Sequence, residues 1–150
     1  MTPGTATRAY LIRLSTFQQQ PLLGSYDQGK LCLNACGLIV ADEWVHAAKN
    51  RQRIEVDTLA ITPNSLSSIL LLQLTTALDS PTSGYLDQPK PWLLSSFIAG
   101  FKAAAAKRIN LRRSQLGQAV WQSSYSEILI TDRERLAHIR EQLQDAANLA

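Results

Sequence analysis

The chain has 150 residues, of which 45% are hydrophobic and 18% charged, and its formal net charge is +3. These values are typical of a globular protein, so we expect residues 1–150 to form one domain with a hydrophobic core. No apolar run reaches the ~18 residues that a membrane-spanning helix needs, and residues 1–9 carry no apolar signal core. We therefore expect a cytoplasmic protein with no membrane contact.

The first third of the chain predicts two strands and a helix. Apolar alternation predicts a strand over residues 9–17, and a polar segment over residues 18–29 follows and ends in a turn. A short strand over residues 30–33 precedes Asn34, which can cap a helix. Apolar residues at helical spacing then continue this helix to about Asn50.

The middle of the chain predicts a β-hairpin. Residues 53–62 are rich in β-branched side chains, and Pro63 and Asn64 are typical of a turn. Residues 66–74 are almost all apolar, which predicts a buried central strand. Because the turn is short, the two strands should pair antiparallel.

The remaining elements are a loop, two helices and a strand. Residues 75–92 are rich in proline, glycine and serine and predict a flexible loop. A helix should follow over residues 95–111, then a strand over residues 120–130, and Thr131 and Asp132 should cap a last helix. Strands and helices do not alternate regularly. We therefore predict an α+β fold with a central antiparallel sheet and helices packed on it.

Cysteine and histidine do not form a recognisable site in the sequence. Cys32 and Cys36 have neither a second cysteine pair nor a nearby histidine, so we expect two buried free thiols rather than a zinc site. His46 and His138 both fall in predicted helices, and His138 lies three residues before Glu141, which indicates a pair on the helix surface. No hydrolytic triad is supported, and we expect no metal and no cofactor.

Positive charge is concentrated in the second part of the chain. Up to residue 89 there are six Lys and Arg against seven Asp and Glu, whereas from residue 90 there are nine against five. Five of the nine cations fall within twelve residues: Lys102, Lys107, Arg108, Arg112 and Arg113. This basic cluster is typical of a protein that binds nucleic-acid phosphates. A solvated helix end, where cations are also favoured, explains it equally well.

Several segments together resemble one protein family. The segments are KLCLNACGLIVADEW (residues 30–44), RIEVDTLAITPN (53–64), FIAGFK with KRIN (97–102 and 107–110), VWQSSY (120–125) and DRERLAHIRE (132–141). In this order and spacing they resemble the REP-associated tyrosine transposases, which belong to the HUH (IS200-like) superfamily of single-strand DNA transposases. The resemblance extends from about residue 9 to residue 149.

The resemblance implies a catalytic mechanism that this chain lacks the residues to perform. In the family, two histidines hold a divalent cation that polarises the scissile phosphate, and a tyrosine on the last helix attacks it. Ser65 and Ser67 stand at the two histidine positions, and alternation on a strand points both to one face. Gln142 stands at the tyrosine position. A serine hydroxyl is a poor transition-metal ligand, and glutamine is no nucleophile.

Tyr125 is the one tyrosine that could replace the missing nucleophile. It follows Trp121 in a predicted strand, where an aromatic side chain is more often part of the core. We therefore interpret Tyr125 as a packing residue. The sequence then predicts no transposase activity.

Three functional hypotheses remain open at the level of sequence. The first is a catalytically inactive protein that binds single-stranded or hairpin DNA, mainly through phosphates and the basic cluster. The second is a domesticated transposase fold that serves as a subunit of a protein complex without binding DNA. The third is a remnant with no selected role. The related transposases can work as dimers, so the resemblance also allows a homodimer.

Overall fold

The computed structural model describes residues 5–75 and 92–147. The core element is a four-stranded antiparallel sheet in the order β4-β5-β1-β6. Its strands are β1 (Thr5–Ser15), β4 (Ile54–Thr62), β5 (Ser65–Thr75) and β6 (Ser126–Ile130). Two long strands, β1 and β5, occupy the centre, and the central position of β5 agrees with its almost wholly apolar composition.

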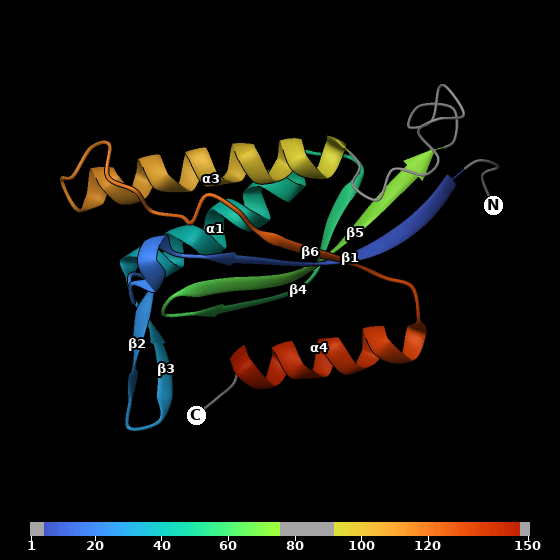
Figure 1. Ribbon diagram of the computed structural model, residues 1–150, viewed down its shortest axis with the longest axis horizontal. Coiled ribbons are helices and arrows are strands. Elements are labelled where there is room, and N and C mark those ends of the chain that lie inside the picture. Colours follow the sequence, from blue (N-terminus) through green and yellow to red (C-terminus); the bar gives the residue numbers. More distant parts are fainter. Residues whose placement is uncertain (1–4, 76–91, 148–150) are drawn as a thin grey trace.

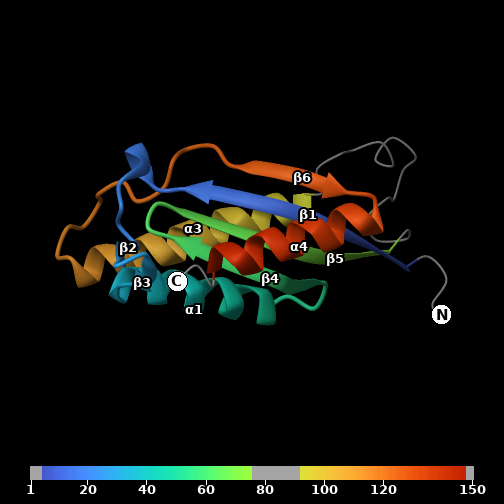
Figure 2. The ribbon, with the colours of Figure 1, turned by 90° about the horizontal axis from the view of Figure 1, so that it is seen from below.

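Three helices cover the two faces of this sheet (Figure 1). Helices α1 (Ala35–Lys49) and α3 (Trp92–Arg112) lie on one face, and α4 (Arg133–Ala147) lies on the other, as Figure 2 shows from below. A separate two-stranded hairpin projects from the sheet and consists of β2 (Gly24–Asp27) and β3 (Lys30–Leu33). A 3-10 turn, η1 (Phe17–Gln19), joins β1 to this hairpin. The predicted α+β class is confirmed.

The period-2 alternation of the central strands divides the buried residues into two cores. On β1, Tyr10 and Ile12 face the larger core beneath α1 and α3, whereas Leu11 faces the smaller core beneath α4. Trp44 is the centre of the larger core, with its ring 5.0 Å from Phe97 and 4.8 Å from Phe101 in edge-to-face contacts. The smaller core joins the sheet to α4 through Ile69, Ile139 and Leu143, among others.

The predicted hairpin and helix cap are confirmed. Thr62 pairs with Ser65, so β4 and β5 are joined by the two-residue turn Pro63 and Asn64. Asn34 Oδ1 accepts a 3.0 Å hydrogen bond from Gly37 N at the start of α1. Such a side-chain cap satisfies one of the backbone donors that a helix start leaves free.

Four sequence predictions are corrected. The predicted strand over residues 120–130 is shorter, because only β6 is regular and Trp121 forms a single bridge with Thr16. Strand β2 falls in the segment expected to be a polar loop, since four largely polar, exposed residues carry no apolar alternation. Helix α3 begins at Trp92 rather than near residue 95. Cys32 is exposed and Cys36 half-buried, so the two thiols are free, as predicted, but not buried.

The predicted loop over residues 75–92 falls almost wholly outside the described residues, which end at Thr75 and resume at Trp92. Within the described part of the chain, no helix is long and apolar enough to cross a membrane.

Candidate nucleic-acid interface

Ser65 and Ser67 lie on the face of the sheet that α4 covers. Residues paired directly across antiparallel strands share a face, and residues two apart on one strand do so as well. Ser67 is two residues before Ile69, which packs against α4 in the smaller core. Ser67 also pairs with Arg13 of β1, and Arg13 pairs with Ser126 of β6. The sequence expectation that both serines point to one face therefore agrees with the strand register.

The hydroxyl of Ser65 takes part in the turn of the β4–β5 hairpin. Its Oγ lies 2.6 Å from Thr62 Oγ1, and Thr62 Oγ1 also lies 3.3 Å from Asn64 Oδ1. This small network stabilises the turn locally, which is a common role for Ser, Thr and Asn next to a turn. Ser65 thus has a structural partner, whatever its further role.

Gln142 lines a hollow of about 460 Å³ between α4 and the β1–β6 side of the sheet. Its polar lining consists of two arginines, an imidazole, an amide and a hydroxyl: Arg13, Arg135, His138, Gln142 and Ser126. Leu11, Ile128 and Ile139 complete it, and no carboxylate of the described residues belongs to the lining. We call this hollow the α4 cavity. Every polar group in it can donate a hydrogen bond, and two are permanently charged, so it suits an anion.

A second hollow continues the α4 cavity along the sheet. It has a volume of about 640 Å³ and shares Arg13 and Ser126 with the first. Its other lining residues are uncharged: Ser15, Gln19, Gln122, Ser123, Ser124 and Tyr125. Together the two hollows form a polar groove with Arg13 at its middle, and the described lining of both lacks Asp and Glu.

An ion pair fixes α4 over this face. Arg140 of α4 donates Nε to Asp57 Oδ2 and Nη2 to Asp57 Oδ1, both at 2.8 Å. Asp57 lies at an irregularity of β4, between Val56 and Thr58 in the register. The hydrogen bond from Arg140 is the main reason that the pKa of Asp57 lies below its usual value. Such a bidentate pair defines orientation as well as contact, so it fixes α4 relative to β4.

Three of the five predicted phosphate-binding residues make contacts within the protein. Lys102 Nζ donates to Gln122 O at 2.8 Å, and burial lowers the pKa of this amine. Arg108 bonds to Asp42 at 2.8 Å and to Glu43 at 3.1 Å. A positive group already paired with carboxylates contributes less to attracting an anion.

Arg113 is the third of these residues and holds the loop after α3. It donates Nε to Asn110 Oδ1 at 2.8 Å and Nη2 to Ala119 O at 3.2 Å. Lys107 and Arg112 are exposed and have no ion pair among the described residues. The basic cluster also lies on α3 and at the residue that follows it, and Figure 1 shows α3 on the opposite face of the sheet from α4.

The three other residues considered in the sequence are Tyr125, His46 and His138. Tyr125 is half-buried and packs against the larger core, as its interpretation as a packing residue predicts. His46 is exposed on α1. His138 and Glu141 are both exposed on α4, as predicted, but they form no ion pair within the described chain, and His138 also lines the α4 cavity. Among the described residues no three His, Cys, Asp or Glu side chains gather as a metal site would require.

Two solved structures are similar to this chain over most of its length. One is a candidate transposase from Deinococcus radiodurans R1, with a TM-score of 0.58, 16% sequence identity, and coverage of 95% of this chain and 93% of that chain. The other is the REP-associated tyrosine transposase bound to a REP hairpin, with a TM-score of 0.56 and 9% identity. This second match covers 92% of the present chain but 65% of the transposase chain. The present chain has a transposase fold.

The similarity lies in the structure rather than in the sequence. No protein-family model matches the chain, and no curated protein matches it in sequence. The family resemblance expected from the sequence is nevertheless confirmed at the level of the fold. Within this transposase fold, the three positions that the resemblance assigns to catalysis lie on facing elements, with Ser65 and Ser67 on β5 and Gln142 on α4.

Sequence reasoning missed that Arg13, Arg135 and His138 come together in the α4 cavity. Arg13 lies on a strand, and Arg135 and His138 lie on a helix more than 120 residues later. Their proximity depends on the pairing of β1 with β6 and on the direction of α4, which composition does not reveal. One signal in the sequence points to this face of the sheet. Arg13 comes two residues after Leu11 in a predicted strand, so the two side chains lie on the same face.

Proposed function

We propose that this protein is a catalytically inactive relative of the tyrosine transposases that binds single-stranded or hairpin DNA through its phosphates. The observation that carries the proposal is the α4 cavity, whose lining combines Arg13, Arg135 and His138 with Gln142 and no carboxylate among the described residues. Phosphate contacts of this type supply affinity and position without reading bases.

Inactivity follows from the chemistry at the three transposase positions. Serine hydroxyls at 65 and 67 are weak ligands for a divalent cation, and one of them already bonds to Thr62. Gln142 has no proton to lose at neutral pH and cannot form the covalent link that a phenol forms. Arginines replace the cation as the positive charge on this face, which favours binding of a phosphate over its cleavage.

Exposed cations of the basic cluster provide a second, weaker contribution. Lys107 and Arg112 have no described ion pair and are open to a ligand. Lys102, Arg108 and Arg113 are held by contacts within the protein, so in this proposal their contribution to binding is smaller. One similar structure supports a DNA hairpin as the ligand, since the REP-associated transposase is bound to a REP hairpin.

A salt titration with a charge-matched control tests the proposal. Binding of fluorescently labelled single-stranded and hairpin DNA is measured by anisotropy for the wild type, for Arg13→Gln with Arg135→Gln, and for Lys30→Gln with Arg133→Gln. Both pairs remove two positive charges, but Lys30 and Arg133 are exposed and outside the cavity lining. We expect the cavity pair to reduce the slope of log K against log salt by about two, since each lost phosphate contact removes about one unit.

Two outcomes contradict the proposal. Absence of binding by the wild type at low salt excludes phosphate recognition and favours the alternative of a protein–protein subunit. An equal loss in both double variants means that net charge, rather than the α4 cavity, attracts the DNA.

A further inference from the structure

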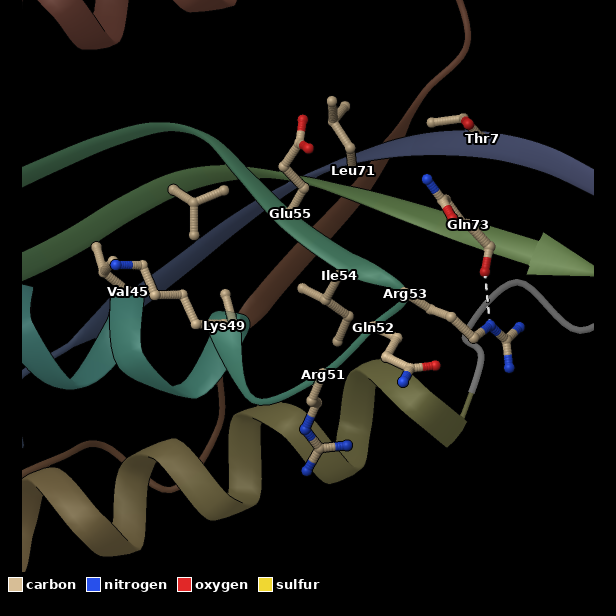
Figure 3. Close-up of a pocket in the computed structure, with 12 residues that line it drawn as sticks. Thr7, Val45, Lys49, Arg51, Gln52, Arg53, Ile54, Glu55, Leu71 and Gln73 are labelled. Carbon is tan, nitrogen blue, oxygen red and sulfur yellow. Dashed lines mark hydrogen bonds between the residues drawn. The ribbon is translucent and has the colours of Figure 1, made fainter.

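A second cationic hollow lies at the β4 edge of the sheet. It has a volume of about 490 Å³ and is formed by the end of α1, the loop to β4, and the neighbouring parts of β1, β4 and β5 (Figure 3). Three of its lining residues are cationic, Lys49, Arg51 and Arg53, and Gln52 lies between the two arginines. Glu55 is the one acidic residue of the described lining. We call this hollow the β4-edge site.

The two arginines of the β4-edge site are held in place by neighbouring groups. Arg51 has its guanidinium carbon 5.8 Å from the centre of the Phe97 ring, and its Nη2 lies 3.4 Å from Ser96 Oγ. Arg53 Nε donates a 2.8 Å hydrogen bond to Gln73 O, as the dashed line in Figure 3 shows. A guanidinium has five N–H donors, and the described contact of Arg51 uses one of them. A cation that is positioned before binding loses less entropy when an anion arrives.

A purely structural role explains one of the three cations. Lys49 is the last residue of α1, where a positive charge complements the exposed carbonyls of the helix end. Arg51 and Arg53 lie beyond the helix, in the loop that leads to β4. Lys49 and Arg51 have no carboxylate within ion-pair distance among the described residues. Arg108 and Arg140, by contrast, are paired with acidic side chains.

The β4-edge site is distinct from the α4 cavity. The two share no lining residue and lie towards opposite edges of the sheet. Thr7 lines the first and Arg13 lines the second, and six residues of extended β1 separate them by roughly 20 Å. One phosphate group cannot contact both.

We propose that the β4-edge site binds a phosphoryl anion. The fork of Arg51 donates to two phosphate oxygens, and the Gln52 amide supplies a neutral donor. Lys49, whose side chain runs along α1 towards Val45 in Figure 3, adds to the positive potential of the hollow without contacting the same anion. The anion has two sources with the same chemistry, a free phosphate compound or a backbone phosphate of a nucleic acid. The site does not depend on the DNA-binding function proposed above.

Calorimetric titration with inorganic pyrophosphate tests the site directly. We expect the wild type to bind, Arg51→Gln to weaken binding about tenfold, and Lys49→Gln to weaken it less, because a charged hydrogen bond contributes more than a mobile point charge. Lys30→Gln removes the same charge from an exposed residue outside the site and should leave the affinity unchanged. Thermal unfolding shows whether Arg51→Gln, which loses a contact with Phe97, is still folded. Lys49 is exposed, so its variant serves where Arg51→Gln does not fold.

The same variants distinguish the two sources of phosphate. If Arg51→Gln and Lys49→Gln also weaken the binding of a labelled single-stranded oligonucleotide, the site holds a backbone phosphate. If they weaken only the binding of pyrophosphate, the ligand of the site is a free phosphate compound. The same titrations in the Arg13→Gln with Arg135→Gln background exclude pyrophosphate bound in the α4 cavity, and the effects of Arg51→Gln and Lys49→Gln should persist there. A wild type that binds pyrophosphate but no oligonucleotide supports the site and contradicts the DNA-binding proposal.

Two results overturn the β4-edge site. The first is no detectable heat of binding at millimolar pyrophosphate. The second is an equal loss of affinity in Lys30→Gln and in the two site variants, because this would show attraction by net charge alone.

Discussion

The indole Nε1 of Trp44 donates a 2.9 Å hydrogen bond to Ser68 Oγ, and Ser68 Oγ donates in turn to Thr58 O at 2.6 Å. Trp44 and Ser68 are both 0% exposed. This chain of two hydrogen bonds connects α1 to β5 and β4 through the larger core. Ser68 therefore points away from Ser67, and the two adjacent serines have unrelated roles on opposite faces of the sheet.

Ser68→Ala should destabilise the fold by about 1–3 kcal/mol, because it leaves the buried indole N–H without an acceptor. Ser67→Ala is the matched control, since the Ser67 side chain is half-buried and makes no hydrogen bond to another described side chain or backbone group. Urea unfolding followed by tryptophan fluorescence measures both. Equal effects of the two substitutions would mean that the register of β5 is shifted by one residue.

The ion pair between Asp57 and Arg140 predicts a dependence of stability on pH. Because Arg140 lowers the pKa of Asp57 in the folded state, the unfolded state takes up a proton at higher pH. The stabilisation is complete above the ordinary Asp pKa of about 4 and is lost as the pH falls towards the folded-state pKa. Its size is limited to about 1 kcal/mol, because the Arg140 side chain is 39% exposed.

Asp57→Asn is the variant that isolates this pair. Its free energy of unfolding should lie below that of the wild type at pH 6, and the difference should shrink as the pH is lowered through the carboxylate range. Urea unfolding at a series of pH values measures it. A difference that stays constant with pH would assign the loss to packing rather than to charge.

The fold was predictable from the sequence where apolar periodicity is strong. The run over residues 66–74 and the turn at Pro63 and Asn64 predicted the central hairpin, and Asn34 predicted the start of α1. Prediction failed for β2 and for the segment around Trp121. Both are short, and their conformation depends on tertiary contacts such as the bridge between Trp121 and Thr16.

The candidate site was predictable only in part. The alternation of Ser65 and Ser67 and their place opposite the last helix follow from local pattern plus the family resemblance. The basic cluster was visible as a run of charges, but a sequence cannot show that Arg108 is paired with Asp42 and Glu43 or that Arg113 supports its own loop. The α4 cavity and the β4-edge site depend on strand order, which no short segment encodes.

Strand cleavage should be absent. Incubation of the protein with end-labelled single-stranded hairpin DNA and magnesium or manganese should leave the DNA intact, because serine hydroxyls at 65 and 67 are weak metal ligands and Gln142 cannot take the place of a tyrosine nucleophile. Denaturing gel electrophoresis measures the products. Tyr125→Phe is the control, and metal-dependent cleavage that persists in this variant would place a catalytic site elsewhere in the chain.

Arg112 and Arg113 are adjacent in sequence but should respond differently to substitution. Arg113→Ala removes hydrogen bonds to Asn110 and Ala119, so we expect it to lower the free energy of unfolding by about 1–2 kcal/mol. Arg112 is exposed without an ion pair among the described residues, so Arg112→Ala should change stability by less than about 0.5 kcal/mol.

Because Arg112 is free to contact a phosphate, Arg112→Ala should reduce the salt slope of DNA binding by about one. Urea unfolding and the anisotropy titration measure the two effects. A salt slope that stays unchanged in Arg112→Ala would mean that Arg112 does not contact phosphate and would leave Lys107 as the remaining cation of the basic cluster without a described ion pair.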